Sequence, residues 1–179
     1  MAWRRIGMVV AALLAAGVAR AEEDALTEAM SRNPDQFEAR TIDLIAGFGG
    51  AEGLTSGQIE AHIALERAGA RASALRRFAA MDLDADGAVT QEELAVSQRA
   101  ASAQGRGRLA RQFTAADADG SGTVDAAEIT TAGAAAALAA LGADEADLLR
   151  ALMQLDADGN GVLTVAEVTA AVARLKGAG

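Results

Sequence analysis

Apolar positions recur at helical spacing along short segments of this chain, and three such segments end in a run of aspartates and glycine. The apolar residues that precede the three runs are Leu75, Phe78 and Met81; Leu109 and Phe113; and Leu148, Leu149, Leu152 and Leu155. Those that follow the runs are Leu94, Ile129 and Val168. A spacing of three and four residues is typical of one face of an α-helix. The pattern therefore predicts an all-α fold in which acidic loops join the helices.

Composition strengthens the helical prediction. Of the 179 residues 51% are hydrophobic, but 48 are alanine, so the large side chains that can form a core are few. Alanine is the strongest helix former, and proline, which breaks helices, occurs once, at Pro34. The length suits one compact domain or two small lobes.

The three acidic runs repeat one twelve-residue pattern. They read DLDADGAVTQEE at 82–93, DADGSGTVDAAE at 117–128 and DADGNGVLTVAE at 156–167. Each run has oxygen-bearing side chains at positions 1, 3 and 5, glycine at 6, an apolar residue at 8 and glutamate at 12. A single copy is compatible with a polar turn, but three copies in the same form argue against that interpretation.

Carboxylates that lie this close repel one another unless a cation lies among them. Ca²⁺ is a hard cation that takes six to eight oxygen ligands. A twelve-residue loop supplies them from positions 1, 3, 5 and 12, from the backbone carbonyl at 7, and from 9 directly or through water. Glycine at position 6 permits the sharp turn that such a loop needs. The pattern therefore predicts three calcium sites.

On these residues the sequence resembles the EF-hand family, whose unit is a helix, a calcium loop and a second helix. The resemblance implies paired hands, with short β-bridges between the position 8 residues of paired loops. A dockerin-type calcium module is a poorer match, because it lacks full entering helices. The residues expected to bind Ca²⁺ are Asp82, Asp84, Asp86, Ala88 and Glu93; Asp117, Asp119, Ser121, Thr123 and Glu128; and Asp156, Asp158, Asn160, Val162 and Glu167.

Because EF hands normally pair, three copies suggest a fourth, altered hand. The segment LTSGQI at 54–59 aligns with VTQEEL at 89–94 and LTVAEV at 163–168. This alignment places Leu54 at position 8 and puts Gln58 where the closing glutamate would stand.

Positions 1, 3 and 5 of the altered hand are then Gly47, Gly49 and Ala51, which carry no carboxylates. We interpret it as a degenerate hand that pairs with the second hand and does not bind Ca²⁺. An ordinary glycine-rich helix-loop-helix is the alternative. The loop is expected to be one residue short if Gly53 takes the turn.

The chain is expected to divide into two lobes. The N-terminal EF-hand pair would occupy 22–103, with the degenerate hand near 34–65 and an intact hand near 72–102. The C-terminal pair would occupy 108–179. The glycines of segment 104–107 are expected to separate the two lobes, because glycine disfavours helix.

Residues 1–21 have the layout of a secretory signal peptide. Arg4 and Arg5 precede an uncharged apolar run at 6–18, and Ala19-Arg20-Ala21 follows as a cleavage site. A membrane anchor is the alternative, but the run is shorter than the ~20 residues that cross a bilayer. The alanine-rich composition and short signal resemble those of exported bacterial proteins. We therefore expect a periplasmic or secreted protein with no stable membrane span after the signal is removed.

Charge and rare residue types narrow the function. The formal charge is −9, with 16 basic and 25 acidic residues. No basic patch is evident along the chain, so nucleic acid is not an expected partner. The absence of cysteine excludes disulfides and thiolate metal sites. His62, the only histidine, is expected on a solvated surface and has no catalytic constellation around it, so we expect no enzyme.

Two functions suit an exported calcium-binding protein. One is a calcium buffer, or a structural binder that calcium stabilises. The other is a calmodulin-like sensor that exposes an apolar groove to an unidentified protein partner. Sensor grooves are often rich in methionine, and the chain after residue 21 has only Met30, Met81 and Met153, which favours the buffer. The 156–167 loop has only three acidic ligands and is expected to bind Ca²⁺ most weakly.

Overall fold

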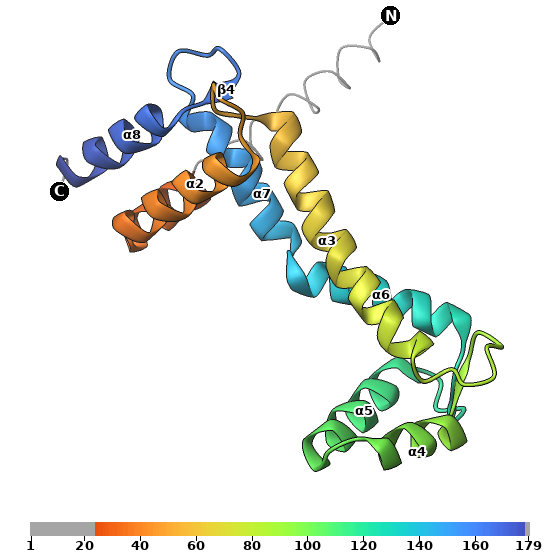
Figure 1. Cartoon of the computed structure of the whole chain (residues 1–179). Coiled ribbons are helices and arrows are strands. Elements are labelled where there is room, and N and C mark those ends of the chain that lie inside the picture. The colour runs from red at the N-terminus through yellow and green to blue at the C-terminus, as the bar shows by residue number, and fades with distance from the viewer. Residues whose placement is uncertain (1–23, 178–179) are drawn as a thin grey trace, which may run out of the picture. The chain divides into compact units, whose positions relative to one another are not determined.

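The computed structural model describes residues 24–177, so the expected signal peptide at 1–21 lies outside the described residues. The chain is mostly helical, with strands of two residues each, and the first described segment, 24–32, is also a helix (Figure 1). The further elements are α2 (Pro34–Phe48), β1 (Leu54–Thr55), α3 (Ser56–Ala79), β2 (Val89–Thr90), α4 (Gln91–Ala100), α5 (Ala103–Ala116), β3 (Thr123–Val124), α6 (Ala126–Ala140), α7 (Ala143–Ala151), the 3₁₀ helix η1 (Leu152–Leu155), β4 (Val162–Leu163) and α8 (Val165–Gly177). The all-α prediction is confirmed.

The chain forms two compact units, and each contains two loops. Unit 1 comprises the described residues 24–63 and 143–177, and unit 2 comprises residues 64–142. In unit 1, β1 pairs antiparallel with β4, and Leu54 lies opposite Leu163. In unit 2, β2 pairs antiparallel with β3, and Val89 lies opposite Val124. The predicted bridges between position 8 residues are therefore confirmed.

The predicted choice of partners is wrong, because the degenerate hand pairs with the last hand and not with the second. The reason is α3, which runs without a break through the segment where two separate helices were expected. As one helix of 24 residues, α3 leaves no turn between the two hands at which the chain could fold back to pair them.

The predicted separator at 104–107 is also wrong, because these residues belong to α5. The Ser102 side chain caps that helix by accepting a hydrogen bond from the Gly105 N–H at 3.1 Å. Only residues 101 and 102 therefore lie between α4 and α5. This short connection keeps the second and third hands side by side, as their paired strands require (Figure 1).

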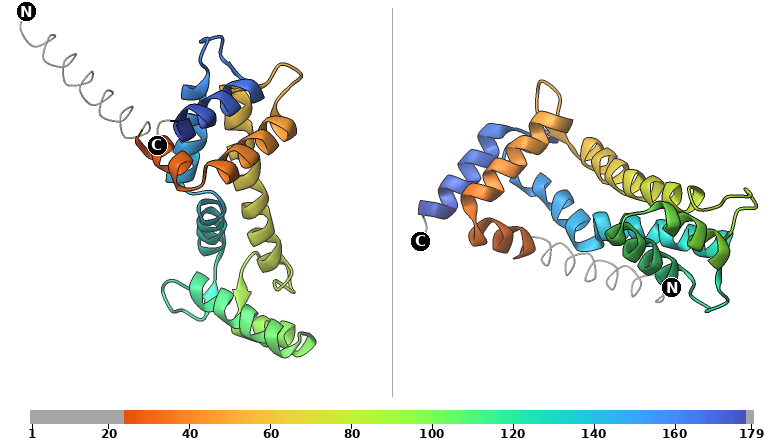
Figure 2. Two further views of the ribbon diagram at one scale, coloured as in Figure 1. Left: turned by 90° about the vertical axis from the view of Figure 1, so that its left-hand side faces the viewer. Right: turned by 60° about the horizontal axis from the view of Figure 1, so that its bottom comes forward.

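Each unit has its own core, built on the bridge residues. In unit 2 the buried cluster joins the entering helices to β2 and β3: Phe78, Met81, Val89, Phe113, Ala116 and Val124. In unit 1 the large buried side chains include Leu54, Ile59, Leu163, Val168 and Val172. There α2 and α8 lie side by side (Figure 2). Burial of such side chains stabilises each unit by about 1.5–3 kcal/mol per residue.

The degenerate hand begins as the sequence predicts and then turns more tightly. Asn33 caps α2 by accepting a hydrogen bond from the Gln36 N–H at 3.1 Å, and Pro34 occupies the first turn. The helix continues through Gly47 to Phe48. Gly50 and Gly53 then pair through backbone hydrogen bonds of 2.8 and 3.2 Å.

The loop of this hand is therefore two residues shorter than an intact one, and not one residue shorter as expected. Eight residues run from Asp117, directly after α5, to Val124, whereas six run from Gly49, directly after α2, to Leu54.

No single helix within residues 24–177 is long and apolar enough to cross a membrane. One bent pair of helices, Ala126–Ala140 with Ala143–Leu155, has the length and composition of a span, and this is weak evidence by itself.

We predict that Gly53→Ala destabilises unit 1. Gly53 has φ +135°, and a Cβ there would lie 2.5 Å from the Leu163 carbonyl oxygen. The midpoint of urea unfolding, followed by far-ultraviolet circular dichroism, should correspond to a loss of about 3 kcal/mol. The control is Gly47→Ala, where a Cβ meets nothing within 4 Å and the helix gains up to about 0.5 kcal/mol. Equal stability of the two variants would contradict this account of the short loop.

Candidate metal sites

The structure gathers acidic oxygen atoms at one place in each intact loop. The three groups, each with one carboxylate oxygen per residue within 4.8 Å of the others, are Asp82, Asp84 and Asp86; Asp117, Asp119 and Glu128; and Asp156, Asp158 and Glu167. These nine residues are all among the predicted ligands. An all-oxygen donor set of this kind suits a hard cation such as Ca²⁺.

Backbone N–H groups turn the aspartates inward. In the last loop the Asp156 carboxylate accepts hydrogen bonds from Gly159 and Gly161 at 2.9 and 2.7 Å, and Asp158 accepts one from Asn160 at 3.0 Å. In both other loops the N–H of the position 6 glycine likewise donates to the position 1 aspartate, at 3.1 Å. Each loop therefore supplies backbone donors to its own carboxylates, and these donors help to bring the oxygens together.

The closing glutamate ties the two ends of its loop together. Glu93 accepts hydrogen bonds from the Leu83 N–H at 2.7 Å and the Thr90 N–H at 2.8 Å, one on each oxygen. The corresponding positions do the same in the other two loops, where Glu128 accepts from Ala118 and Asp125, and Glu167 accepts from Ala157 and Thr164. Glu93 is held in this way although it does not belong to the close group of its loop.

These hydrogen bonds favour the charged carboxylates. The N–H of Thr90, and then that of Leu83, lowers the pKa of Glu93, and the N–H and hydroxyl of Thr164 lower the pKa of Glu167. The N–H and hydroxyl of Ser121 lower the pKa of Asp119. The loops therefore keep these residues ionised, as ligands of a divalent cation must be.

One atom supports the fit of these residues to a cation. The Oδ1 atom of Asp117 is buried and has no hydrogen-bond partner among the described residues, while its Oδ2 atom accepts from Gly122. A buried carboxylate oxygen without a donor costs free energy. A metal ion bound among Asp117, Asp119 and Glu128 would satisfy it.

The degenerate loop keeps the frame of a hand without its ligands. Gln58 accepts hydrogen bonds from the Thr55 N–H and hydroxyl at 2.8 and 2.9 Å, as Glu93 does from Thr90. This arrangement supports the predicted alignment of Gln58 with the closing glutamate. Gly47, predicted at position 1, lies within α2, so the predicted positions 1, 3 and 5 do not form a loop of normal length.

Comparison with known proteins agrees with this geometry. A family model described as EF hand matches residues 75–96 and residues 109–131. The chain contains EF hands. No match was found among curated proteins, and none among solved structures. The two matched segments are the paired hands of unit 2.

The last EF hand lies outside the matched segments but has the same geometry. Its loop shows the same glutamate contacts and the same antiparallel bridge. It differs at Asn160, whose amide donates a hydrogen bond to Asp158 Oδ2 at 3.0 Å and so competes for an oxygen that a cation would use. The prediction that this loop binds most weakly stays a prediction, and this contact supports it.

His62 is half-buried, so it is less solvated than expected. Its ring packs against Phe48 at a centroid distance of 4.4 Å, and Nδ1 is buried without a hydrogen-bond partner among the described residues. The α2–α3 contact therefore uses His62 as a packing residue within unit 1.

Ala85 has a backbone conformation that the sequence reasoning missed. Its φ is +62°, and it is the one residue other than glycine with a positive φ among the described residues. It stands at position 4, where the other EF-hand loops have Gly120 and Gly159, each with φ +70°. Comparing position 4 across the three runs would have revealed it. An alanine in this conformation costs about 1–2 kcal/mol.

We predict that Ala85→Gly stabilises unit 2 by about 1 kcal/mol, because glycine adopts a positive φ without strain. Urea unfolding of the calcium-free protein should show a higher midpoint. As a control, Ala88→Gly in the same loop should lower stability by roughly 0.5–1 kcal/mol, since Ala88 has no positive φ. A loss of stability in Ala85→Gly would show that the loop is not strained there.

Proposed function

We propose that this EF-hand protein is exported, loses residues 1–21 and binds three Ca²⁺ ions. It would act as a calcium buffer, or the bound ions would stabilise its own fold. The observation that carries the proposal is the convergence of carboxylate oxygens within 4.8 Å in three loops. The signal-like layout of residues 1–21 supports export. No enzymatic activity is part of the proposal.

The ligands would come from the three loops, and the ion would supply the positive charge that their carboxylates lack. Side chains at positions 1, 3, 5 and 12 and the carbonyls of Ala88, Thr123 and Val162 would hold it. In the calcium-free chain, backbone N–H groups and a few side-chain donors offset the repulsion within each group only in part. Calcium binding is therefore expected to stabilise both units.

The placement of methionine favours the buffer over a sensor. Met30 and Met81 are 7% and 2% exposed, so neither lines an open groove in this state. Met81 lies in the core of unit 2, and Met153 is half-buried. The adaptable apolar surface on which many sensors rely is therefore sparse among the described residues.

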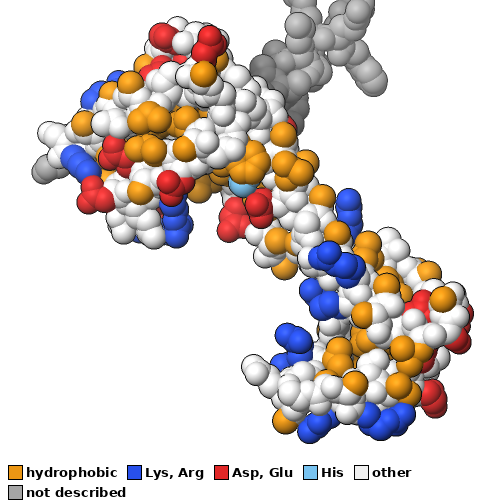
Figure 3. All heavy atoms as spheres, viewed as in Figure 1, with side chains coloured by type: hydrophobic (Ala, Val, Ile, Leu, Met, Phe, Trp, Pro, Cys, Tyr) orange, Lys and Arg blue, Asp and Glu red, His pale blue; other side chains and the backbone are white. Residues whose placement is uncertain are grey.

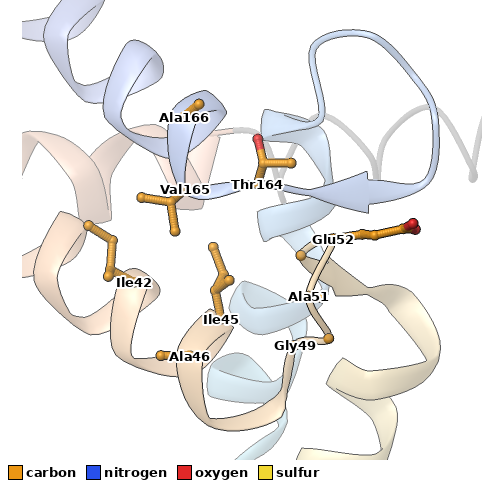
Figure 4. Close-up of a pocket in the computed structure, with 11 residues that line it drawn as sticks. Ile42, Ile45, Ala46, Gly49, Ala51, Glu52, Thr164, Val165 and Ala166 are labelled. Carbon is orange, nitrogen blue, oxygen red and sulfur yellow. The ribbon is translucent and has the colours of Figure 1, made fainter.

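A sensor role has one observation in its favour, a partly apolar cavity of about 430 Å³ in unit 1. It lies between the end of α2, the degenerate loop and the start of α8. Ile45 and Val165 point into it from opposite sides, and Ile42 and Ala46 complete its apolar wall (Figure 4). Such a cavity has room for an apolar side chain of a protein partner.

A dye titration separates the two functions. We predict that adding Ca²⁺ to the chain that begins at Glu22 compacts it, measured by small-angle scattering, without a large rise in fluorescence of an apolar dye. A rise of several-fold would favour the sensor. The control is the triple variant with Glu93→Gln, Glu128→Gln and Glu167→Gln. It leaves the core and the bridge residues unchanged but weakens all three calcium sites. If this variant compacts like the wild type, calcium binding at the loops is not the cause.

A further inference from the structure

Charge is distributed unevenly between the two units. The described part of unit 1 has five basic and thirteen acidic residues, a formal charge of −8. Unit 2 has eight basic and ten acidic residues, a formal charge of −2. All eight basic residues are arginines, and nine of the ten acidic residues lie in the two loops. The total charge of the chain therefore conceals that unit 2 is basic outside its loops.

The α4–α5 hairpin concentrates this positive charge. Residues 94–116 contain four arginines and no acidic residue. The arginines are Arg99, Arg106, Arg108 and Arg111, all exposed, and none of them has an ion-pair partner among the described residues. In Figure 3 basic side chains lie along this hairpin and acidic ones gather at the loops. We call these four residues the arginine face.

The hairpin is a fixed support for the arginine face. The Gln98 side chain donates a hydrogen bond to the Arg106 carbonyl at 3.3 Å, and the Arg106 guanidinium donates one to the Ala101 carbonyl at 2.9 Å. Leu109 and Phe113 turn toward the core of unit 2, which leaves Arg108 and Arg111 on the outer side of α5.

One exposed large apolar side chain lies on the same hairpin as the arginines. Val96 is 41% exposed and stands one turn before Arg99 on α4, which buries no residue. Leu83, in the 82–93 loop of the same unit, is 55% exposed. Phe78 and Phe113 are buried and cannot stack on nucleic-acid bases. The combination fits an anionic bilayer, which offers phosphates to guanidinium groups and an apolar layer to aliphatic side chains.

We propose that the arginine face of unit 2 docks on anionic phospholipid and that calcium switches this docking on. Without calcium, the acidic loops leave unit 2 at −2 and oppose contact with a negative surface. Two Ca²⁺ ions in the 82–93 and 117–128 loops bring it to +2 while the arginines stay in place. The calcium dependence rests on the proposed function; the role of the arginines does not.

Vesicle co-sedimentation tests the proposal with the chain that begins at Glu22. With Ca²⁺, the protein should bind vesicles containing phosphatidylglycerol but not pure phosphatidylcholine vesicles, and it should dissociate in chelator or high salt. The double variant Arg99→Gln and Arg108→Gln should bind about 25-fold more weakly. Its matched control is Arg40→Gln with Arg174→Gln, two exposed arginines of unit 1, which should bind like the wild type.

The variants also exclude the simplest artefact, calcium ions that bridge lipid phosphates to any acidic protein. Bridging would not distinguish the two double variants, so equal binding by both overturns the proposal. Calcium uptake is measured on the same samples. Uptake without vesicle binding would overturn the docking proposal alone, whereas no uptake would show that calcium binding itself had failed. Arginine-dependent self-association without vesicles, or arginine-dependent binding to a DNA oligomer but not to vesicles, would assign the face to another partner and also overturn the proposal.

Discussion

Both units depend on backbone pairing between two loops, with the position 8 side chains buried against each other. Leu54, Leu163, Val89 and Val124 are each completely buried where the loops meet. Without a partner strand, each would leave an apolar side chain and unpaired backbone groups in water. This explains why a hand without ligands persists, since Leu54 and its short glycine loop give the last hand the partner that it needs.

The electrostatics of the loops follow from the same frame. Pairing fixes the end of each loop, the closing glutamate joins that end to the beginning, and backbone N–H groups then point the aspartates inward. The result is a cluster of charges that the protein stabilises only in part, as the unpartnered oxygen of Asp117 shows. Calcium ions would neutralise this cluster. In unit 2 they would also change the net charge of the unit that carries the arginines from negative to positive.

Local features of the fold could be predicted from the sequence, whereas features that depend on several segments could not. Ligand spacing, the bridge residues and the Asn33 cap follow from a few neighbouring positions. The partner of each hand depends on whether α3 continues through Gly69, and one glycine opposes a long alanine-rich helix by only about 1 kcal/mol. The arginine face was hidden because the total charge of the chain averages over two units of different character.

Equilibrium dialysis of the chain that begins at Glu22 against calcium up to millimolar concentration tests the central claim most directly. The account predicts three bound ions per chain, and the loss of about one ion in each of the single variants Glu93→Gln, Glu128→Gln and Glu167→Gln. Gln58→Ala should leave the number unchanged, because the degenerate loop offers no carboxylate ligands at its predicted positions. No uptake of calcium, or uptake that these glutamate variants do not alter, would contradict the account.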